Sequence, residues 1–183
     1  MKQITTPLSN KVIRDLKAGE QIILSGTIYT GRDAAHKRIA ELLDRGNPLP
    51  FDFQGQAIYY AGPCPAPPGK IIGSAGPTTS SRMDEYTPRL IQKGLRVMIG
   101  KGLRNSAVID AIRQYTGVYL TAVGGAGAFY SKCVESSEIV AFDELGAEAV
   151  FKLTVRDMPL VVSIDCKGDS IYELRERIVE ETL

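Results

Sequence analysis

The stretch from Ser74 to Tyr86, SAGPTTSSRMDEY, gathers groups that bind an oxyanion. Gly76 permits backbone angles closed to other residues, and Pro77 stiffens the turn. Hydroxyl side chains follow at four successive positions, Thr78, Thr79, Ser80 and Ser81. Arg82 then adds a planar fork suited to a carboxylate, and the helix expected after it adds free amides and a partial positive charge. The pattern predicts an anion site, against the alternative of a helix capped by Ser80 or Ser81 with a surface arginine beside it.

A second candidate stretch is TGRDAAHKR, which follows an apolar segment. Asp33 is expected to cap the next helix, which leaves Arg32 at the end of the loop and His36 in the first helical turn. Arg32 would then be placed to hold a second carboxylate. The alternative is that Arg32 and His36 are solvated polar residues, since a lone histidine is a weak signal.

The third candidate is Lys101, which lies between Gly100 and Gly102 in IGKGLRN. The glycines let the backbone approach a ligand that the ammonium neutralises, although such a turn is more often structural. It is not a Walker A loop, and AVGGAGA is not GxGxxG. Cys64, in the proline-stiffened AGPCPAPPGK, is expected to be packed rather than nucleophilic. Two arginines, one lysine and a row of hydroxyls fit a small dicarboxylate better than a nucleotide.

The elements that must position these residues alternate between strands and helices. Apolar, β-branched runs predict strands at residues 21–30, 57–62, 70–76, 96–101, 117–124, 137–143, 151–157 and 160–166. The last two runs are expected to form a hairpin or adjacent edge strands, because Pro159 between them is awkward within a ladder. Helices are predicted over residues 33–45, 83–93 (with Pro88 as a kink), 105–115 (capped by Asn105 or Ser106), 126–134 and 170–182. The alternation predicts an α/β fold whose Gly-rich turns converge at the carboxyl ends of parallel strands.

The composition describes one ordinary globular domain over residues 1–183. Hydrophobic residues make up 44% and charged residues 23%, and the formal net charge of +1 argues against nucleic-acid or membrane-surface partners. No run approaches the ~20 apolar residues of a membrane span, and the first residues lack the apolar region of a signal peptide. A cytoplasmic location is therefore expected. Three scattered cysteines favour neither disulfides nor a metal site built from this chain alone.

Four segments that occur in a fixed order along the chain identify a family more specifically than any one of them alone. SGTIYTGRDAAHKR, YYAGPCPAPPGKIIGSAGPTTSSRMDEYTP, MIGKGLRN and YLTAVGGAGA together resemble the β subunit, or C-terminal domain, of the iron–sulfur class I fumarate hydratases and L-tartrate dehydratases. The resemblance covers nearly the whole chain. Ser81 departs from it, because many relatives have Gly there.

The resemblance implies a three-layer β/β/α swivelling domain with a largely parallel central sheet and a smaller antiparallel sheet. It also implies a [4Fe–4S] cluster that an α partner holds on three cysteines, with one iron acting as a Lewis acid. The two parts would assemble as a hetero-oligomer, in which this domain closes over the cluster.

For the residues, the resemblance implies a reversible hydration of fumarate to (S)-malate. Arg32 and Arg82 would hold the carboxylates, Lys101 would stabilise charge beside the carbanion, and Thr78 would take the C3 proton. Thr79 is expected to contact substrate, and His36 to contact substrate or to orient Arg32 or Thr78. The acid for the leaving hydroxyl would come from the partner.

Two other functions remain open from the sequence. L-tartrate dehydratase performs the same elimination on a substrate with one more hydroxyl, and the residues above do not discriminate between the two. A noncatalytic anion-binding or regulatory module is the alternative from another class, which the retention of all the named polar residues disfavours.

Overall fold

The computed structural model describes residues 1–173. Its strands are β1 (Lys2–Thr6), β2 (Gln21–Thr30), β3 (Ala57–Tyr59), β4 (Val97–Gly100), β5 (Val118–Thr121), β6 (Val134–Ala141) and β7 (Val150–Ile164). Its α-helices are α1 (Asn10–Arg14), α2 (Asp33–Asp44), α3 (Thr87–Gln92), α4 (Ser106–Tyr115) and α5 (Gly127–Tyr130). Three 3-10 helices complete the set, η1 (Ser80–Met83), η2 (Ser131–Cys133) and η3 (Asp143–Glu148).

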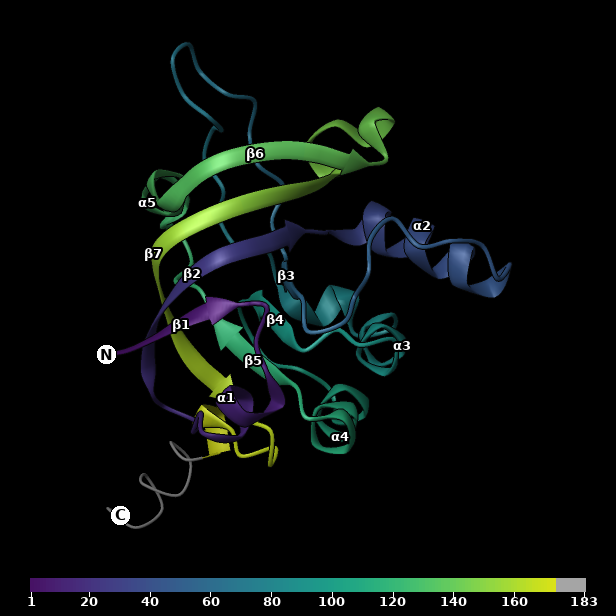
Figure 1. Ribbon diagram of the computed structural model, residues 1–183, viewed down its shortest axis with the longest axis vertical. Coiled ribbons are helices and arrows are strands. Elements are labelled where there is room, and N and C mark those ends of the chain that lie inside the picture. Colours follow the sequence, from purple (N-terminus) through teal and green to yellow (C-terminus); the bar gives the residue numbers. More distant parts are fainter. Residues whose placement is uncertain (174–183) are drawn as a thin grey trace.

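The strands form one sheet in the order β1-β2-β3-β4-β5-β7-β6. The first five strands are parallel neighbours, whereas β7 is antiparallel to both β5 and β6. β7 also pairs with β2, so that β2, β3, β4, β5 and β7 close into a barrel-like ring (Figure 1). The α/β class is confirmed. The antiparallel strands, however, are continuous with the central sheet, where we expected a separate smaller sheet.

The prediction of two strands separated at Pro159 is wrong, because β7 runs through this residue. Pro159 lies opposite Ile23 of β2. Its carbonyl accepts a hydrogen bond from the Tyr130 hydroxyl at 3.3 Å, so the backbone polar groups of Pro159 face away from β2, toward the other edge of β7. On that edge β6 pairs only up to Val155, and β5 pairs only from Val161. A missing N–H therefore breaks no ladder at this position.

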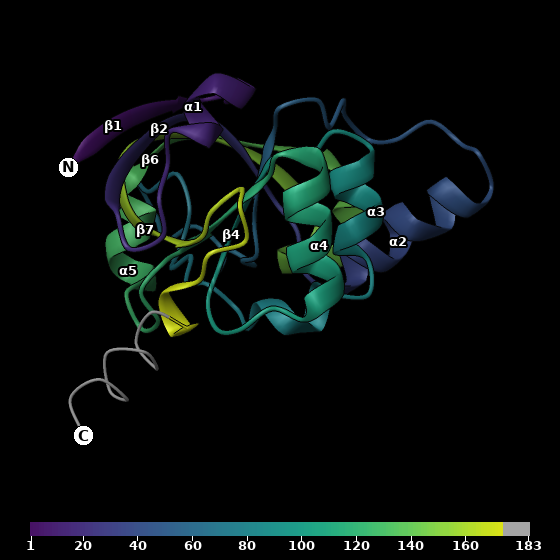
Figure 2. The same ribbon diagram turned by 90° about the horizontal axis from the view of Figure 1, so that it is seen from below.

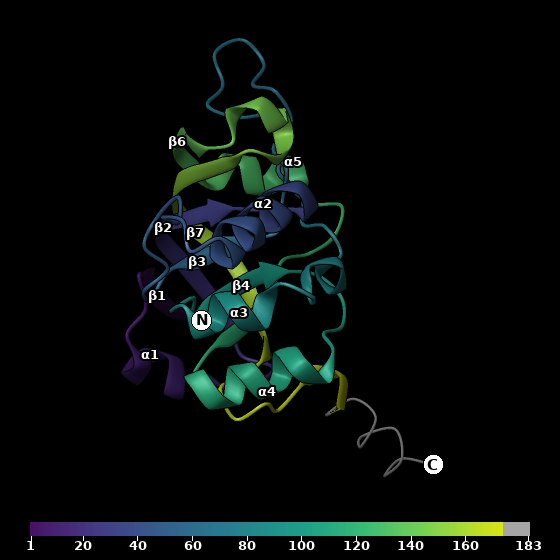
Figure 3. The same cartoon turned by 90° about the vertical axis from the view of Figure 1, so that its right-hand side faces the viewer.

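The predicted strand at residues 70–76 is also wrong, because this segment is one arm of a loop that projects past β6 (Figures 1 and 3). Its apolar residues Ile72 and Ala75 are buried against the barrel core, which explains the strand-like pattern. Backbone hydrogen bonds join the two arms of the loop. The Cys64 amide donates to the Ser74 carbonyl at 2.9 Å, and the Gly73 amide donates to the Cys64 carbonyl at 3.0 Å. A Cβ atom at Gly73 would lie 2.5 Å from the Pro65 carbonyl oxygen, so only glycine fits there.

The helix predictions fare better. α2 and α4 are confirmed, and the Asn105 side chain caps α4 by accepting from the Val108 amide at 3.0 Å. The helix predicted over residues 83–93 is instead η1 followed by α3, and Pro88 lies at the start of α3 rather than at a kink. The 126–134 helix is shorter and ends in η2. β1 and α1 were not predicted, and most of the helix predicted at 170–182 lies outside the described residues.

Two hydrophobic cores hold the fold together. One fills the ring of strands, with residues such as Leu24, Ile28, Tyr59, Ile99, Leu120 and Leu153. The other lies between the sheet and helices α2, α3 and α4, which gather on one side in Figure 2, with residues such as Ile39, Ile58, Tyr60, Leu90, Met98 and Ile112. Successive residues of β3 and β4 alternate between the two cores, as side chains of a strand must. In the described part of the chain no helix is both long and apolar enough to cross a membrane.

Candidate functional site

The predicted site residues follow the carboxyl ends of neighbouring parallel strands. Arg32 follows β2, Lys101 follows β4, and the turn Thr78–Arg82 crosses between β3 and β4. The Thr78 amide donates to the carbonyl of Tyr60 just after β3 at 2.7 Å, and the Ser80 amide donates to the carbonyl of Lys101 at 2.9 Å. Thr79 and Lys101 form a parallel β-bridge. The hydroxyl-rich turn is therefore fastened to both strand ends.

Ser80 is the fastening residue rather than a ligand donor or a helix cap. Its buried hydroxyl accepts from the Lys101 amide at 3.0 Å and lies 2.9 Å from the Tyr119 hydroxyl. A Cβ atom at Gly100 would collide with this hydroxyl, so the glycine before Lys101 makes room for Ser80. The N-cap of η1 is Thr79, and its side chain makes no capping bond. The predicted cap by Ser80 or Ser81 is therefore wrong.

Asp33 does not cap α2, contrary to the prediction. It is the first residue of the helix, and its carboxylate turns to Arg82: Arg82 Nε donates to Oδ1 at 2.9 Å, and Nη2 lies 2.9 Å from Oδ2. The capping role falls to Glu148 at the end of η3, whose Oε2 accepts from the Ala34 amide at 2.9 Å. A carboxylate at a helix N-terminus suits both the free amides and the helix dipole.

Arg32 and Arg82 share the Asp33 carboxylate. Arg32 Nη2 lies 3.9 Å from Asp33 Oδ2 and 3.4 Å from Glu148 Oε1. The stem of Arg32 also packs on Gly62 after β3, where a Cβ atom would lie 3.0 Å from Arg32 Cδ. The two guanidiniums are thus held near each other, and the side chains are partly exposed, at 27% for Arg32 and 50% for Arg82. This is an arrangement that can receive more than one carboxylate.

Lys101 lies against the loop after β5. Its Nζ is 3.7 Å from the position that a Cβ atom of Gly124 would take, so the IGKG and AVGG loops meet at the lysine side chain. Thr78 is partly buried and Thr79 is exposed beside it. The structure thus joins Arg32 to Arg82 through Asp33, and Lys101 to Thr79 through the backbone.

His36 lies beneath the site and is fully buried. Its Nδ1 is 2.8 Å from the Arg32 carbonyl oxygen, and because a carbonyl can only accept, Nδ1 carries the proton. The ring packs against Tyr60 and Tyr86. This contact fits the expected role of orienting Arg32, whereas the burial of the ring within this chain leaves it no surface for a substrate.

Burial lowers the pKa of His36 to about 4 from an ordinary value of 6.5. The hydrogen bond to the Arg32 carbonyl opposes this shift, and the charges of Arg104 and Asp33 have smaller effects that lower and raise the pKa respectively. As the pH falls, His36 is therefore protonated in the unfolded chain before it is protonated in the folded chain. The contribution of the neutral imidazole to the free energy of unfolding is fully present above pH 6.5 and is lost as the pH falls toward 4. Between pH 7 and pH 5 we expect wild type to lose about 2 kcal/mol more unfolding free energy than His36→Gln, measured by urea denaturation. His36 is the only histidine of the chain, so equal losses in both proteins would contradict the neutral buried imidazole.

Arg104, two residues after Gly102, is a buried charge that the sequence reasoning missed. Its Nε donates to Asp84 Oδ1 at 2.6 Å with the side chain fully buried, and its Nη2 donates to the Thr87 hydroxyl at 2.9 Å. The guanidinium also lies over the rings of Tyr60 and Tyr119 at 5.2 and 5.0 Å. This network ties the loop that carries Lys101 to the segment that carries Arg82. No local pattern marks it, because its hydrogen-bond partners are 17 to 44 residues away.

The cysteines of this chain do not fit an iron–sulfur cluster. Cys64 is exposed, Cys133 and Cys166 are partly buried, and all three are free thiols. Within residues 1–173 no three His, Cys, Asp or Glu side chains lie close enough together to hold a metal ion. A cluster needs several thiolates at one place, which these residues do not supply.

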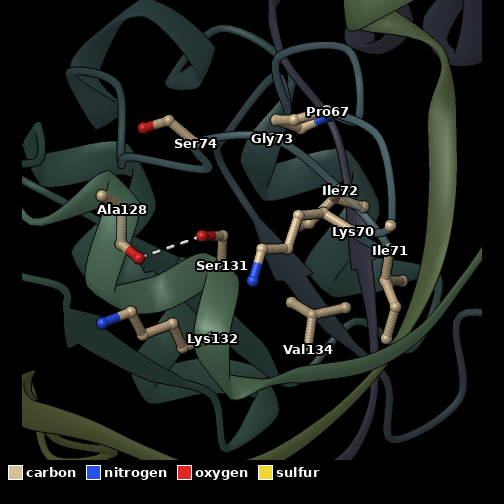
Figure 4. Close-up of a pocket in the computed structure, with 11 residues that line it drawn as sticks. Pro67, Lys70, Ile71, Ile72, Gly73, Ser74, Ala128, Ser131, Lys132 and Val134 are labelled. Atoms are coloured by element: carbon tan, nitrogen blue, oxygen red, sulfur yellow. Dashed lines mark hydrogen bonds between the residues drawn. The ribbon is translucent and has the colours of Figure 1, made fainter.

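A cavity of about 520 Å³ lies elsewhere, between residues 67–74 and the α5–η2 segment (Figure 4). Its polar side chains are Lys70, Ser74, Ser131 and Lys132. The Ser131 hydroxyl already donates to the Ala128 carbonyl at 3.0 Å. Arg32, Thr78, Arg82 and Lys101 are not part of its lining. It is therefore a separate hollow from the candidate site.

Comparison with known proteins shows the family to which the chain belongs. A family model described as Fumarase C-terminus matches residues 2–175. The aerobic class I fumarate hydratase of Escherichia coli K12 is 39% identical over 175 residues, 94% of this chain and 31% of that protein. Fumarate hydratase 2 of Leishmania major is 41% identical over 157 residues, 84% of this chain and 28% of that protein.

A shorter relative matches along almost its whole length. The putative L(+)-tartrate dehydratase subunit beta of Methanocaldococcus jannaschii is 38% identical over 189 residues, 100% of this chain and 97% of that protein. The chain therefore spans about a third of the length of the fumarate hydratases that it matches, and nearly all of this dehydratase subunit.

Proposed function

The chain belongs to the family of fumarase C-termini, and on that premise we propose that it is the β part of a hydro-lyase that reversibly hydrates fumarate to (S)-malate. The observation that carries the proposal is the turn Thr78–Arg82, which is fastened across the ends of β3 and β4 beside Arg32 and Lys101. A dicarboxylate needs separated cationic groups of this kind, and a proton transfer at C3 needs a group between them.

In this proposal each side chain has a distinct task. Arg82 and Arg32 bind the two carboxylates, and Lys101 stabilises the charge that develops on the carboxylate beside C3 as the proton leaves. Thr78 takes that proton in the dehydration direction. A threonine hydroxyl is a weak base at its ordinary pKa, so a neighbouring guanidinium is needed to favour the ionised form. His36 and Ser80 act indirectly, through the backbones of Arg32 and Lys101.

We assign the [4Fe–4S] cluster to a separate α part, since the described cysteines of this chain do not fit one. The proposed complex is a cytoplasmic hetero-oligomer in which this domain swivels over the α part. The acid that protonates the leaving hydroxyl also belongs to that part. The chemistry of the present chain is then limited to binding the carboxylates and moving the C3 proton.

L-tartrate is the second candidate substrate, and a specific observation favours it. The relative that the chain matches over 97% of its length is named as a tartrate dehydratase subunit beta. The same cations would hold the carboxylates of either substrate, so the choice depends on the extra hydroxyl of tartrate, which the residues assigned above do not address.

The test is an anaerobic assay of the purified chain, alone and combined with a cluster-bearing α chain from the same organism. The proposal predicts no turnover by the chain alone, and turnover of fumarate by the combination. Turnover of L-tartrate but not of fumarate would select the second candidate. Fumarate hydration by the isolated chain would contradict the division of labour, and a combination that is inactive on both substrates would leave a noncatalytic anion-binding module.

A further inference from the structure

We propose that Asp33 is a positioning residue, which orients the Arg82 guanidinium so that its outer edge is presented to the dicarboxylate. The inference rests on the proposed function and deepens it. It starts from the atoms that the two side chains use. Asp33 binds the Nε and Nη2 side of the fork, at 2.9 Å for each of the two contacts.

With Asp33 on this edge, Arg82 keeps N–H donors that are not bound by Asp33. A guanidinium has five N–H groups, and a carboxylate can bind it either along the Nε–Nη2 edge or along the Nη1–Nη2 edge. Because Asp33 occupies the first edge, the second edge can still form a two-point pair with a substrate carboxylate. Asp33 is therefore placed to orient Arg82 rather than to compete with the substrate for it.

Asp33 is also held more firmly than Arg82. It is the first residue of α2, which is anchored by the buried residues Ala35, His36 and Ile39. Its carboxylate does not cap the helix, because Glu148 accepts the hydrogen bond from the Ala34 amide. Arg82 lies on a 3-10 helix of four residues with half of its side chain exposed, so its many rotamers would otherwise compete. A fixed carboxylate that grips a mobile guanidinium preorganises it for binding.

The alternative is that the pair merely ties α2 to η1. The chain offers a matched control for this alternative, because Asp44 at the other end of α2 binds Arg89 of α3 at 2.7 Å. Each pair joins an aspartate of α2 to an arginine of the stretch from η1 to α3. Only the Asp33 pair contains a proposed substrate-binding residue.

The kinetic test uses the complete complex with its cluster-bearing partner. We expect Asp33→Asn to lower kcat/KM about fivefold to tenfold and Asp44→Asn to change it less than about twofold. In an Arg82→Lys background, Asp33→Asn should have less than about a twofold further effect, because its role is exerted through the fork that lysine lacks. Equal losses for the two aspartates, or an undiminished loss in the lysine background, would overturn the proposal. So would tighter dicarboxylate binding by Asp33→Asn, which would show competition.

A second measurement does not depend on turnover. In the isolated chain labelled with ¹⁵N-arginine, the Nε–H signal of Arg82 should exchange slowly with solvent in wild type and in Asp44→Asn, and fast in Asp33→Asn. An Arg82 signal that is indifferent to Asp33→Asn would overturn the inference whatever the activity. If the wild-type complex turns over neither fumarate nor tartrate, the proposed function fails, and this signal separately decides whether Asp33 orients Arg82.

Discussion

Thr78→Ala should lower the kcat of the assembled complex roughly a hundredfold while changing KM by less than about threefold. The hydroxyl is assigned to the C3 proton, a contact that gains importance only in the transition state. Arg32, Arg82 and Lys101 remain to bind the dicarboxylate. The turn itself should survive, because it is held by the Thr78 amide on the Tyr60 carbonyl rather than by the side chain.

Steady-state kinetics in both directions, under anaerobic conditions, would measure this effect. Ser81→Ala is the matched control, because it removes an exposed hydroxyl from the same turn and should leave both constants within about twofold. If Thr78→Ala raises KM at constant kcat, Thr78 donates a hydrogen bond to bound substrate and is not the base.

Arg104→Ala should lower the free energy of unfolding by about 3–5 kcal/mol. The substitution leaves the Asp84 carboxylate buried without its cation and removes the hydrogen bond to the Thr87 hydroxyl. Arg156→Ala is the control, since its pair with Glu135 has the same distance of 2.6 Å but is exposed on both sides. That pair should contribute no more than about 1 kcal/mol.

Urea denaturation of both variants and wild type would test the contrast between burial and exposure. If Arg104→Ala proves too unstable to purify, Arg104→Lys keeps the charge but loses the fork, and should still be less stable than Arg156→Ala. Equal small losses at the two positions would contradict the view that the buried network holds the Lys101 loop.

Elements with a strong local signal could be predicted from the sequence. The apolar stripe of α2, the cap of α4 at Asn105 or Ser106 and the strand runs of β2, β4 and β5 all depend on neighbours within a few residues. β7 was predicted as two strands because Pro159 disfavours a ladder. Whether a proline disrupts pairing depends on which edge of the strand is occupied, and this is set by distant strands.

In the candidate site, too, features set by local sequence could be predicted and features set by distant residues could not. The resemblance and the residue types pointed to Arg32, Thr78, Arg82 and Lys101, and the topology places them at neighbouring strand ends. The role of Asp33 was predicted wrongly, because a cap is a local contact, whereas its true partner Arg82 is 49 residues away. Arg104 and Glu148 were missed for the same reason. Charges that pair across the fold leave no periodic trace in a single sequence.

The most direct test of the central claim is a structure of the assembled complex with (S)-malate bound. The account predicts one malate carboxylate on the Nη1–Nη2 edge of Arg82, the other within hydrogen-bond reach of Arg32, and Lys101 and Thr78 beside the C2–C3 bond. Malate bound elsewhere would contradict it, for example in the cavity lined by Lys70 and Lys132, with Arg82 and Lys101 making no contact to either carboxylate.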